Sequence, residues 1–251
     1  MDFQIERLHN GILLFKITRP EKRNAVNYAV MDGLKQVIER AKEADVQALV
    51  ITGEGERAFC SGGDLSVFHE LRTEEEAYTM LSKMGRILYD LTVLAKPTVA
   101  LVNGAAVGGG CEIAAACDFR IAKTGAKLGF IQGNLAITTG WGGGTLLFER
   151  IPSHLALKLL TTAAVYRAEQ LDQIGFINRV VDQADEAAAE RFLQTELSMA
   201  PSVLAAYKQM QIHKWEASGL LDRMTKEIRQ CAVLWESEAH HKAVESFLKK
   251  K

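Results

Sequence analysis

The chain has 251 residues, 48% of them hydrophobic, and its 30 basic and 31 acidic side chains leave a formal net charge of −1. That length and composition suffice for a substantial buried core in one large domain or two smaller ones. The near-zero charge provides no whole-molecule field that would attract nucleic acid or an anionic membrane, so we expect neither partner.

Targeting and redox features favour a cytoplasmic protein. The first ten residues, MDFQIERLHN, lack the basic-then-apolar pattern of a secretory signal, and no apolar run reaches the length of a membrane span. We expect reduced, packed cysteines and no metal, because the cysteines form no CxxC pair and no ligand set with nearby histidines. The same reasoning places five histidines on the surface, namely His69, His154, His213, His240 and His241.

The N-terminal part of the chain predicts a β-hairpin and then alternating helices and strands. Residues 3–18 hold two apolar segments around the turn pair Asn10-Gly11, which is typical of a hairpin. Asn27 is suited to cap a helix whose apolar residues share one face, and residues 48–51 predict a buried strand. Thr73 opens a capping-box pattern ahead of a long amphipathic helix.

The stretch KPTVALVNGAAVGGGCEIAAACD, from Lys96 to Asp118, has the features of an active site. A short apolar strand leads to Gly108-Gly109-Gly110, which leaves bare N–H groups at the start of an apolar helix. Exposed amides at a helix start favour a negatively charged oxygen. Glu112 is the one carboxyl group in the first turn of that helix, and its apolar neighbours can tune its pKa.

A second strand exit with glycines precedes this stretch, in the segment AFCSGGDL. Two such exits, each with a backbone N–H at a glycine, can jointly hold one oxygen atom. Paired donors of this kind are the recurring device for stabilising a developing oxyanion. The sequence therefore predicts carbonyl chemistry.

Past Asp118 the chain changes from strands to helices. Strands are predicted at residues 119–122, 127–130 and 178–181, and a third glycine cluster occupies residues 140–144. From Ala184 onward only helices are predicted, near residues 185–200, 202–215, 219–236 and 238–249. We therefore divide the chain into a ββα core, residues 1–183, and a C-terminal helical region, residues 184–251, which covers the pocket and contacts other subunits.

Four segments together resemble the enoyl-CoA hydratase/isomerase, or crotonase, family over essentially the whole chain: RPEKRNAVN, AFCSGGDL, KPTVALVNGAAVGGGCEIAAACD and the WGGG turn. The resemblance implies an α/β fold, a crotonase-like spiral of ββα units with a helical C-terminal region, assembled as a trimer or hexamer. It also implies an acyl-CoA thioester substrate whose enolate is stabilised by two amides. No separate cofactor is expected, because coenzyme A is part of the substrate.

Carried over residue by residue, the resemblance assigns the oxyanion donors to the N–H groups of Gly63 and Gly109, and a catalytic carboxyl to Glu112. Each donor is expected to supply about 3–4 kcal/mol of transition-state stabilisation. Trp141 becomes a lid over the acyl pocket or a core-filling residue. The implied acyl-CoA contacts are Lys22, Arg23, Ala25, Gly63, Asp64, Leu65, Ser66, Gly109, Phe247 and Lys250. For Lys22 and Arg23 a solvated charge run is an equally good interpretation, and Asp64 is better suited to cap the turn than to transfer a proton.

One position departs from the hydratase pattern. Hydratases of the family use two glutamates, and Gln132 occupies the place of the second. An amide can hold a water or a carbonyl but cannot exchange a proton at neutral pH, which puts hydration and double-bond isomerisation in doubt. Decarboxylation of a malonyl-type thioester needs no second carboxylate, because loss of carbon dioxide itself produces the enolate. The segments around Gln132 also resemble the ethylmalonyl-CoA decarboxylase branch of the family.

Both reactions, enoyl-CoA hydration and decarboxylation, stay open at this point. Two non-enzymatic alternatives are a silent CoA-binding subunit and an RNA-binding member of the same family. The near-zero net charge argues against RNA, and the intact glycine pair with Glu112 argues against silence.

Overall fold

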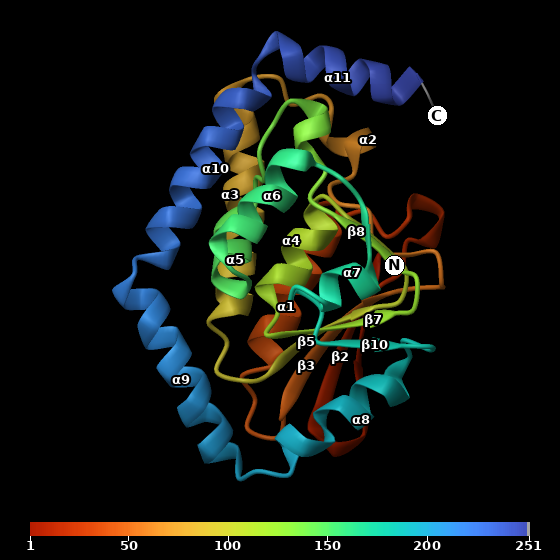
Figure 1. Cartoon of the computed structure of the whole chain (residues 1–251), viewed down its shortest axis with the longest axis vertical. Helices are drawn as coiled ribbons and strands as arrows, with labels where there is room; N and C mark the ends of the chain where they lie inside the picture. Colours follow the sequence, from red (N-terminus) through yellow and green to blue (C-terminus); the bar gives the residue numbers. More distant parts are fainter. Residues whose placement is uncertain (250–251) are drawn as a thin grey trace.

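Two sheets form the centre of the protein, seen in a computed structural model that describes residues 1–249, with side chains described except at 195–197 and 248 (Figure 1). The larger sheet has six strands in the order β1-β2-β3-β5-β7-β10, and the smaller has four in the order β4-β6-β8-β9. The strands are β1 (Phe3–Arg7), β2 (Ile12–Ile17), β3 (Ala48–Gly53), β4 (Ala58–Cys60), β5 (Thr98–Val102), β6 (Ala105–Val107), β7 (Phe119–Lys123), β8 (Lys127–Gly129), β9 (Tyr166–Arg167) and β10 (Arg179–Val181).

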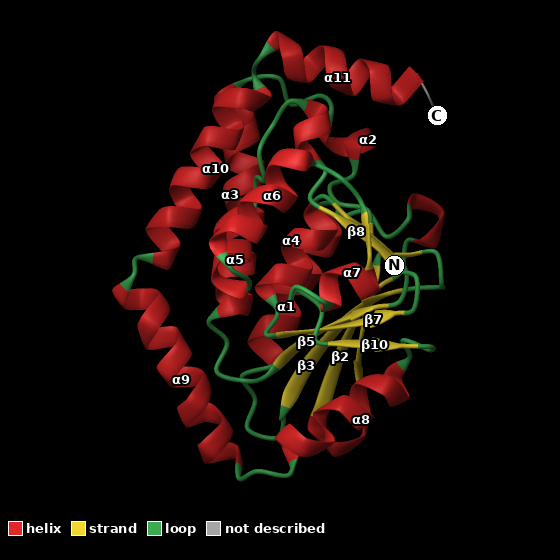
Figure 2. Ribbon diagram, in the orientation of Figure 1, coloured by secondary structure: helices red, strands yellow, loops and turns green. Residues whose placement is uncertain are grey.

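Helices follow most of the strands and then form the whole C-terminal region (Figure 2). The α-helices are α1 (Tyr28–Arg40), α2 (Leu65–Phe68), α3 (Glu74–Thr92), α4 (Gly109–Ala116), α5 (Gly143–Arg150), α6 (Ser153–Thr162), α7 (Ala168–Asp172), α8 (Glu186–Leu197), α9 (Pro201–Ala217), α10 (Leu220–Trp235) and α11 (Glu238–Lys249). Three short 3-10 helices are η1 (His9–Gly11), η2 (Pro20–Lys22) and η3 (Gln132–Leu135).

The strand order results from repeated ββα units, as predicted. β3, β5 and β7 pair in parallel in the larger sheet, whereas β4, β6 and β8, which follow them along the chain, pair in parallel in the smaller sheet. Each unit therefore sends one strand to each sheet before its helix returns. Parallel neighbours end at the same edge of a sheet, so the turn after β4 and the helix after β6 meet there.

Local signals in the sequence explain the ends of several elements. The predicted hairpin is confirmed, because β1 pairs antiparallel with β2; its turn is the three-residue helix η1, in which Asn10 and Gly11 have φ of 57° and 70°. Asn27 caps α1 by accepting a hydrogen bond from the Val30 amide at 3.0 Å. Thr73 forms the predicted capping box at the start of α3.

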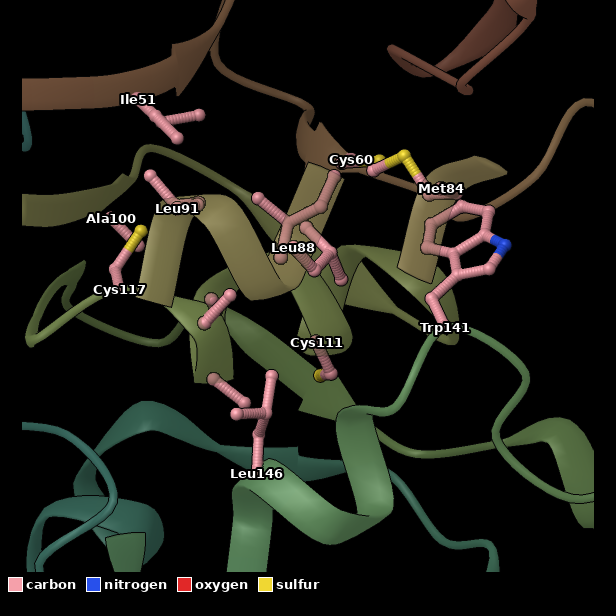
Figure 3. Close-up of a cluster of buried hydrophobic side chains, with 14 of the residues drawn as sticks. Ile51, Cys60, Met84, Leu88, Leu91, Ala100, Cys111, Cys117, Trp141 and Leu146 are labelled. Atoms are coloured by element: carbon pink, nitrogen blue, oxygen red, sulfur yellow. The ribbon is translucent and has the colours of Figure 1, made fainter. Parts of the chain in front are cut away.

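The main core lies between the sheets and helices α1, α3, α4, α5 and α10, and the close-up in Figure 3 shows part of it around α3 and α4. All of the cysteines are buried and free, as predicted. Cys60 and Cys111 lie on neighbouring elements, and Gly110 permits this close approach because a Cβ there would lie 2.1 Å from the Cys60 carbonyl oxygen. These two thiols serve packing rather than chemical reactivity, because burial raises their pKa values.

The C-terminal helices are as predicted, but they cover two different faces of the core. α8 packs against the far face of the larger sheet through Ala189 and Leu193, and α10 packs along α3. α11 lies across the top of the molecule in Figure 1 and contacts η3. Within residues 1–249 no helix is long and apolar enough to cross a membrane.

Candidate active site

A cavity of about 490 Å³ opens where the turn after β4, the start of α4, the segment 131–141 and helices α10 and α11 converge. Its lining brings together Gly63, Gly109, Glu112, Gln132 and Trp141, which are far apart in the sequence. The rest of the lining is largely apolar. Within the described part of the chain Glu112 is the one carboxyl group on this lining, and neither lysine nor arginine lines it.

The two predicted donor glycines lie at adjoining backbone turns. Gly62 has a φ of 92°, and a Cβ added to it would lie only 3.0 Å from the Gly109 nitrogen, so the turn after β4 touches the start of α4. Around Gly63 the chain is held by bonds from the Val26 amide to the Gly62 oxygen at 2.8 Å and from the Asp64 amide to the Val26 oxygen at 2.9 Å. Among residues 1–249, neither the Gly63 nor the Gly109 amide donates a hydrogen bond within the protein. Both amides therefore lie at touching turns with no hydrogen-bond partner among the described residues.

Trp141 lies directly against these glycines. A Cβ on Gly109 would lie 2.1 Å from the indole carbon Cζ3, and one on Gly63 would lie 3.7 Å from Cζ2. The indole is 4% exposed, lines the cavity and also joins the main core, beside Met84 in Figure 3. Trp141 therefore fills the core, as one interpretation proposed, and its ring requires glycine at position 109, whereas its role as a lid over an acyl group stays a prediction.

Glu112 is 2% exposed and accepts hydrogen bonds from four groups. Its Oε1 accepts from Gln132 Nε2 at 2.8 Å and from the Gly140 amide at 3.4 Å, and its Oε2 accepts from the amides of Trp141 at 2.8 Å and Gly143 at 2.9 Å. Burial and, next, the negative charge of Glu227 raise the pKa of Glu112 to about 7, against the lowering effect of these hydrogen bonds. Glu112 can therefore hold or release a proton near neutral pH.

Gln132 faces Glu112 in the position that the sequence assigned to a missing second carboxyl. It is 9% exposed and begins η3. While its Nε2 donates to Glu112, its Oε1 is buried and has no hydrogen-bond partner among the described residues. An amide thus fills the place next to the carboxyl, and it cannot replace a second acid or base.

The far end of α4 is held by two buried arginines that sequence reasoning missed. Arg120 donates to the carbonyl oxygens of Ala114 at 3.3 Å and Cys117 at 2.9 Å, and Arg150 donates to those of Ala115 at 2.9 Å and Ala116 at 3.3 Å. Cations at a helix C-terminus complement its dipole and satisfy its free carbonyl groups. They fix the helix whose first amide belongs to Gly109.

Two further residues near the cavity escaped sequence reasoning. Glu227 on α10 contacts the loop that holds Glu112, and no motif marks it. His240 on α11 corrects a prediction: it is 2% exposed rather than on the surface, it lines the cavity, and its Nδ1 lies 2.7 Å from the Leu135 oxygen. Its ring also packs against Trp235 at 4.7 Å between centroids. The apolar spacing of α11 could have indicated a buried position, because Val244, four residues on, is buried too.

The remaining predicted acyl-CoA contacts separate into residues that line the cavity, residues exposed beside it and residues that do not line it. Leu65 and Phe247 line the cavity, with Phe247 40% exposed. Lys22 and Arg23 are exposed and lie beside the cavity. Ser61, which lines the cavity, donates from its hydroxyl to the Lys22 carbonyl oxygen at 3.3 Å and from its amide to the Arg23 carbonyl oxygen at 3.1 Å. Contact with coenzyme A stays a prediction for all of them.

Ala25, Asp64 and Ser66 do not line the cavity. Asp64 caps α2, as one interpretation of the sequence proposed, by accepting from the Ser66 amide at 3.0 Å. Its other oxygen accepts from Arg19 at 2.7 Å, so the carboxylate is directed at this arginine. Lys250 lies outside the described residues.

Taken together, the site has two adjoining amides without a hydrogen-bond partner among the described residues, one carboxyl group able to carry a proton, and a largely apolar cavity beside them. Such a site can stabilise an enolate and move one proton to or from carbon.

Comparison with proteins of related sequence and structure identifies the family of this chain. Residues 7–251 match the family model described as enoyl-CoA hydratase/isomerase. The chain is 34% identical to a short-chain-enoyl-CoA hydratase of Clostridium acetobutylicum, over 79% of this chain and 76% of that protein. It is 32% identical to an ethylmalonyl-CoA decarboxylase of Bos taurus, over 82% of this chain and 68% of that protein.

An enoyl-CoA hydratase/isomerase from Xanthobacter autotrophicus Py2 has the same fold, with a TM-score of 0.90 at 24% identity, over 99% of this chain and 93% of that one. The fold, the match along nearly the whole sequence and the two relatives above 30% identity agree with one another. The chain therefore belongs to the enoyl-CoA hydratase/isomerase family and is an acyl-CoA-processing enzyme of that family.

Proposed function

We propose that this enzyme decarboxylates a malonyl-type acyl-CoA thioester. The observation that carries the proposal is the contact between Gln132 Nε2 and Glu112 Oε1, at 2.8 Å, where a two-carboxyl mechanism would need a second acid or base. With one carboxyl on the described lining of the cavity, the site suits a reaction that needs one proton transfer.

The reaction has two steps. In the first, the bond between the α-carbon and the substrate carboxylate breaks, carbon dioxide leaves, and the electron pair moves into the thioester to give an enolate. Its oxygen accepts hydrogen bonds from the amides of Gly63 and Gly109. In the second, the neutral carboxyl of Glu112 gives its proton to the α-carbon, and the carboxylate that remains is protonated again by solvent. Atoms and charge balance in both steps.

Gln132 can serve both protonation states of Glu112. Its Nε2 donates to the carboxylate, and after a half-turn of the amide its now unpartnered Oε1 would accept the proton of the neutral carboxyl. The other three contacts of Glu112 are backbone amides and can only donate. Gln132 is thus the neighbour that can accept a hydrogen bond from the acid form.

The composition of the cavity supports loss of carbon dioxide. Within residues 1–249 its lining has no lysine or arginine to neutralise a bound carboxylate, and it includes apolar groups such as Met80, Leu81 and Ile137. A carboxylate loses its hydration in such surroundings, and this cost disappears when neutral carbon dioxide forms. The Bos taurus relative, an ethylmalonyl-CoA decarboxylase, supports the same substrate class.

Product analysis tests the proposal. Purified protein is incubated separately with ethylmalonyl-CoA, methylmalonyl-CoA and crotonyl-CoA, and the thioesters are weighed by mass spectrometry. We expect loss of carbon dioxide from a malonyl-type substrate. The proposal would be rejected if crotonyl-CoA gained water while neither malonyl-type thioester was turned over.

Hydration is the second candidate, favoured by the Clostridium acetobutylicum relative, which is a short-chain-enoyl-CoA hydratase. It would require Glu112 alone to activate water and deliver the proton, while Gln132 holds the water by its amide. The incubation with crotonyl-CoA measures this directly.

The pH profile provides a further prediction. We expect kcat for decarboxylation to fall as pH rises through about 7, because the pKa of Glu112 is raised to about 7 and the acid form delivers the proton. If the carboxylate form of Glu112 acted as a base, kcat would instead rise with pH over the same range, so a rising rate would show that the carboxylate is the active form. Glu112→Gln is the control, since it should be slow and should lose this pH dependence while keeping the acceptor for the loop amides.

Assembly as a trimer or hexamer stays a prediction. Helix α9 has three apolar side chains on its outer side, Val203, Tyr207 and Met210, which are 42%, 64% and 66% exposed in the single chain. We expect this face to contact another copy of the chain, since large exposed apolar groups favour burial. Light scattering should show an oligomer at micromolar concentration, and Tyr207→Glu should weaken it; a strictly monomeric parent protein would contradict the prediction.

A further inference from the structure

One loop, residues 139–145, is held from two sides by carboxyl groups on different helices. Glu112 of α4 accepts hydrogen bonds from the amides of Gly140, Trp141 and Gly143. Glu227 of α10 accepts from the next two amides, those of residues 144 and 145. Five of the seven backbone amides in this loop therefore donate to two carboxyl groups, and the loop supplies the indole that covers the oxyanion donors.

Glu227 makes close contacts with this loop. Its Oε1 accepts from the Thr139 hydroxyl at 2.6 Å and from the Gly144 amide at 3.0 Å, and its Oε2 accepts from the Thr145 amide at 2.6 Å. Gly144 and Thr145 belong to the first turn of α5, and Gly143, the first residue of that helix, donates to Glu112. The two carboxyl groups thus share one helix N-terminus on consecutive amides.

The two carboxyl groups differ in their surroundings, which decides where a proton is held. Glu112 is 2% exposed, whereas Glu227 is half-buried and accepts three hydrogen bonds of 3.0 Å or less. Burial raises the pKa of Glu227 too, while its hydrogen bonds to the Thr139 hydroxyl and to the amides of residues 144 and 145 act in the opposite direction, and its negative charge is one of the causes that raise the pKa of Glu112. Two like charges on one helix start are costly, so the first proton goes to the more buried Glu112.

Few other titratable groups face Glu112 in the described structure. Cys111 lies beside it on α4, Cys231 faces it from α10, and His240 faces the cavity from α11. Burial raises the pKa of both thiols and lowers the pKa of His240, so all three are neutral near pH 7. Removing the charge of Glu227 should therefore change the pKa of Glu112.

We propose that Glu227 is a positioning residue whose negative charge, held at the start of α5, sets the proton affinity of Glu112. It holds the start of α5 in place, and its negative charge favours the acid form of Glu112. The inference rests on the proposed function only where it assumes that the proton of Glu112 is transferred to the α-carbon of the substrate. The effect on Glu112 itself can be measured without substrate.

The test is a titration of Glu112 by NMR in protein labelled with ¹³C at the glutamate carboxyl carbons. The resonance of Glu112 is identified by its absence in Glu112→Gln. In the parent protein it should titrate near pH 7. In Glu227→Gln the midpoint should shift to lower pH by on the order of one unit, because a neighbouring negative charge has been removed.

Two control variants separate charge from structure. Glu236→Gln makes the same substitution at the end of α10, where the carboxylate accepts from the Glu74 amide at 2.8 Å, at the start of α3. Thr139→Val removes a hydrogen bond to Glu227 but leaves its charge. Both should leave the Glu112 midpoint where it is in the parent protein.

The rate profile then connects the shift to turnover. With an acidic shift of about one unit, decarboxylation by Glu227→Gln should fall about fivefold at pH 7 and recover at lower pH. A folded Glu227→Gln protein whose Glu112 midpoint is unchanged would overturn the inference, as would a midpoint that Thr139→Val shifts equally. A shifted midpoint in a protein that decarboxylates no malonyl-type thioester would uphold the inference and reject the proposed function.

Discussion

Replacing Gly109 by proline should lower kcat about 10²–10³-fold relative to alanine at the same position, when both are compared in a Trp141→Ala background. Proline removes the N–H group that the proposed oxyanion needs, and loss of one such donor typically has this effect. Gly109 is the first residue of α4, a helix position at which proline is tolerated. Steady-state kinetics on a malonyl-type thioester measure the difference.

The background variant is needed because of the contact between Gly109 and Trp141. Any Cβ at position 109 would lie 2.1 Å from the indole, so even alanine would displace the ring in the parent protein. Removing the indole first leaves the lost N–H as the main difference between the proline and alanine variants. Thermal unfolding confirms that both variants fold. Equal kcat values for the two would reject Gly109 as an oxyanion donor.

Gln132→Glu should raise the hydration of crotonyl-CoA by about 10²–10⁴-fold, the usual contribution of a general acid or base. The new carboxyl would lie next to Glu112, whose Oε1 is 2.8 Å from the present amide nitrogen. Two carboxyl groups that close share one proton, so one can activate water while the other delivers a proton to carbon. Decarboxylation should fall, since the added negative charge opposes a substrate carboxylate.

Asn134→Asp is the matched control for this substitution. Asn134 lies on the same short helix and lines the same cavity, but its amide donates to the Ala163 oxygen at 2.9 Å instead of to Glu112. It should add the same charge without adding hydration. If the folded Gln132→Glu protein hydrates crotonyl-CoA no faster than the parent, then Gln132 is not what limits hydration, and the main support for decarboxylation is lost.

Much of the fold follows from short stretches of sequence. Asn27 and Thr73 cap their helices by bonds to amides three residues away, and the turn of the first hairpin depends on Asn10 and Gly11. Apolar runs such as residues 98–102 form buried strands. These features are local, because capping bonds and turn conformations join residues that are neighbours in the chain, and a pattern can therefore reveal them.

The sequence by itself also indicated which groups line the candidate site, since its glycine-rich strand exits, Glu112 and the unusual Gln132 all occur in recognisable segments. What only the tertiary structure decided is how these groups are held. Glu227 reaches Thr145 across 82 positions of sequence, and buried His240 reaches Leu135 across 105. Tertiary packing decides which face of a helix is buried. It also decides which charged group lies beside a carboxyl group. That packing determines the proton affinity of Glu112, which no local pattern encodes.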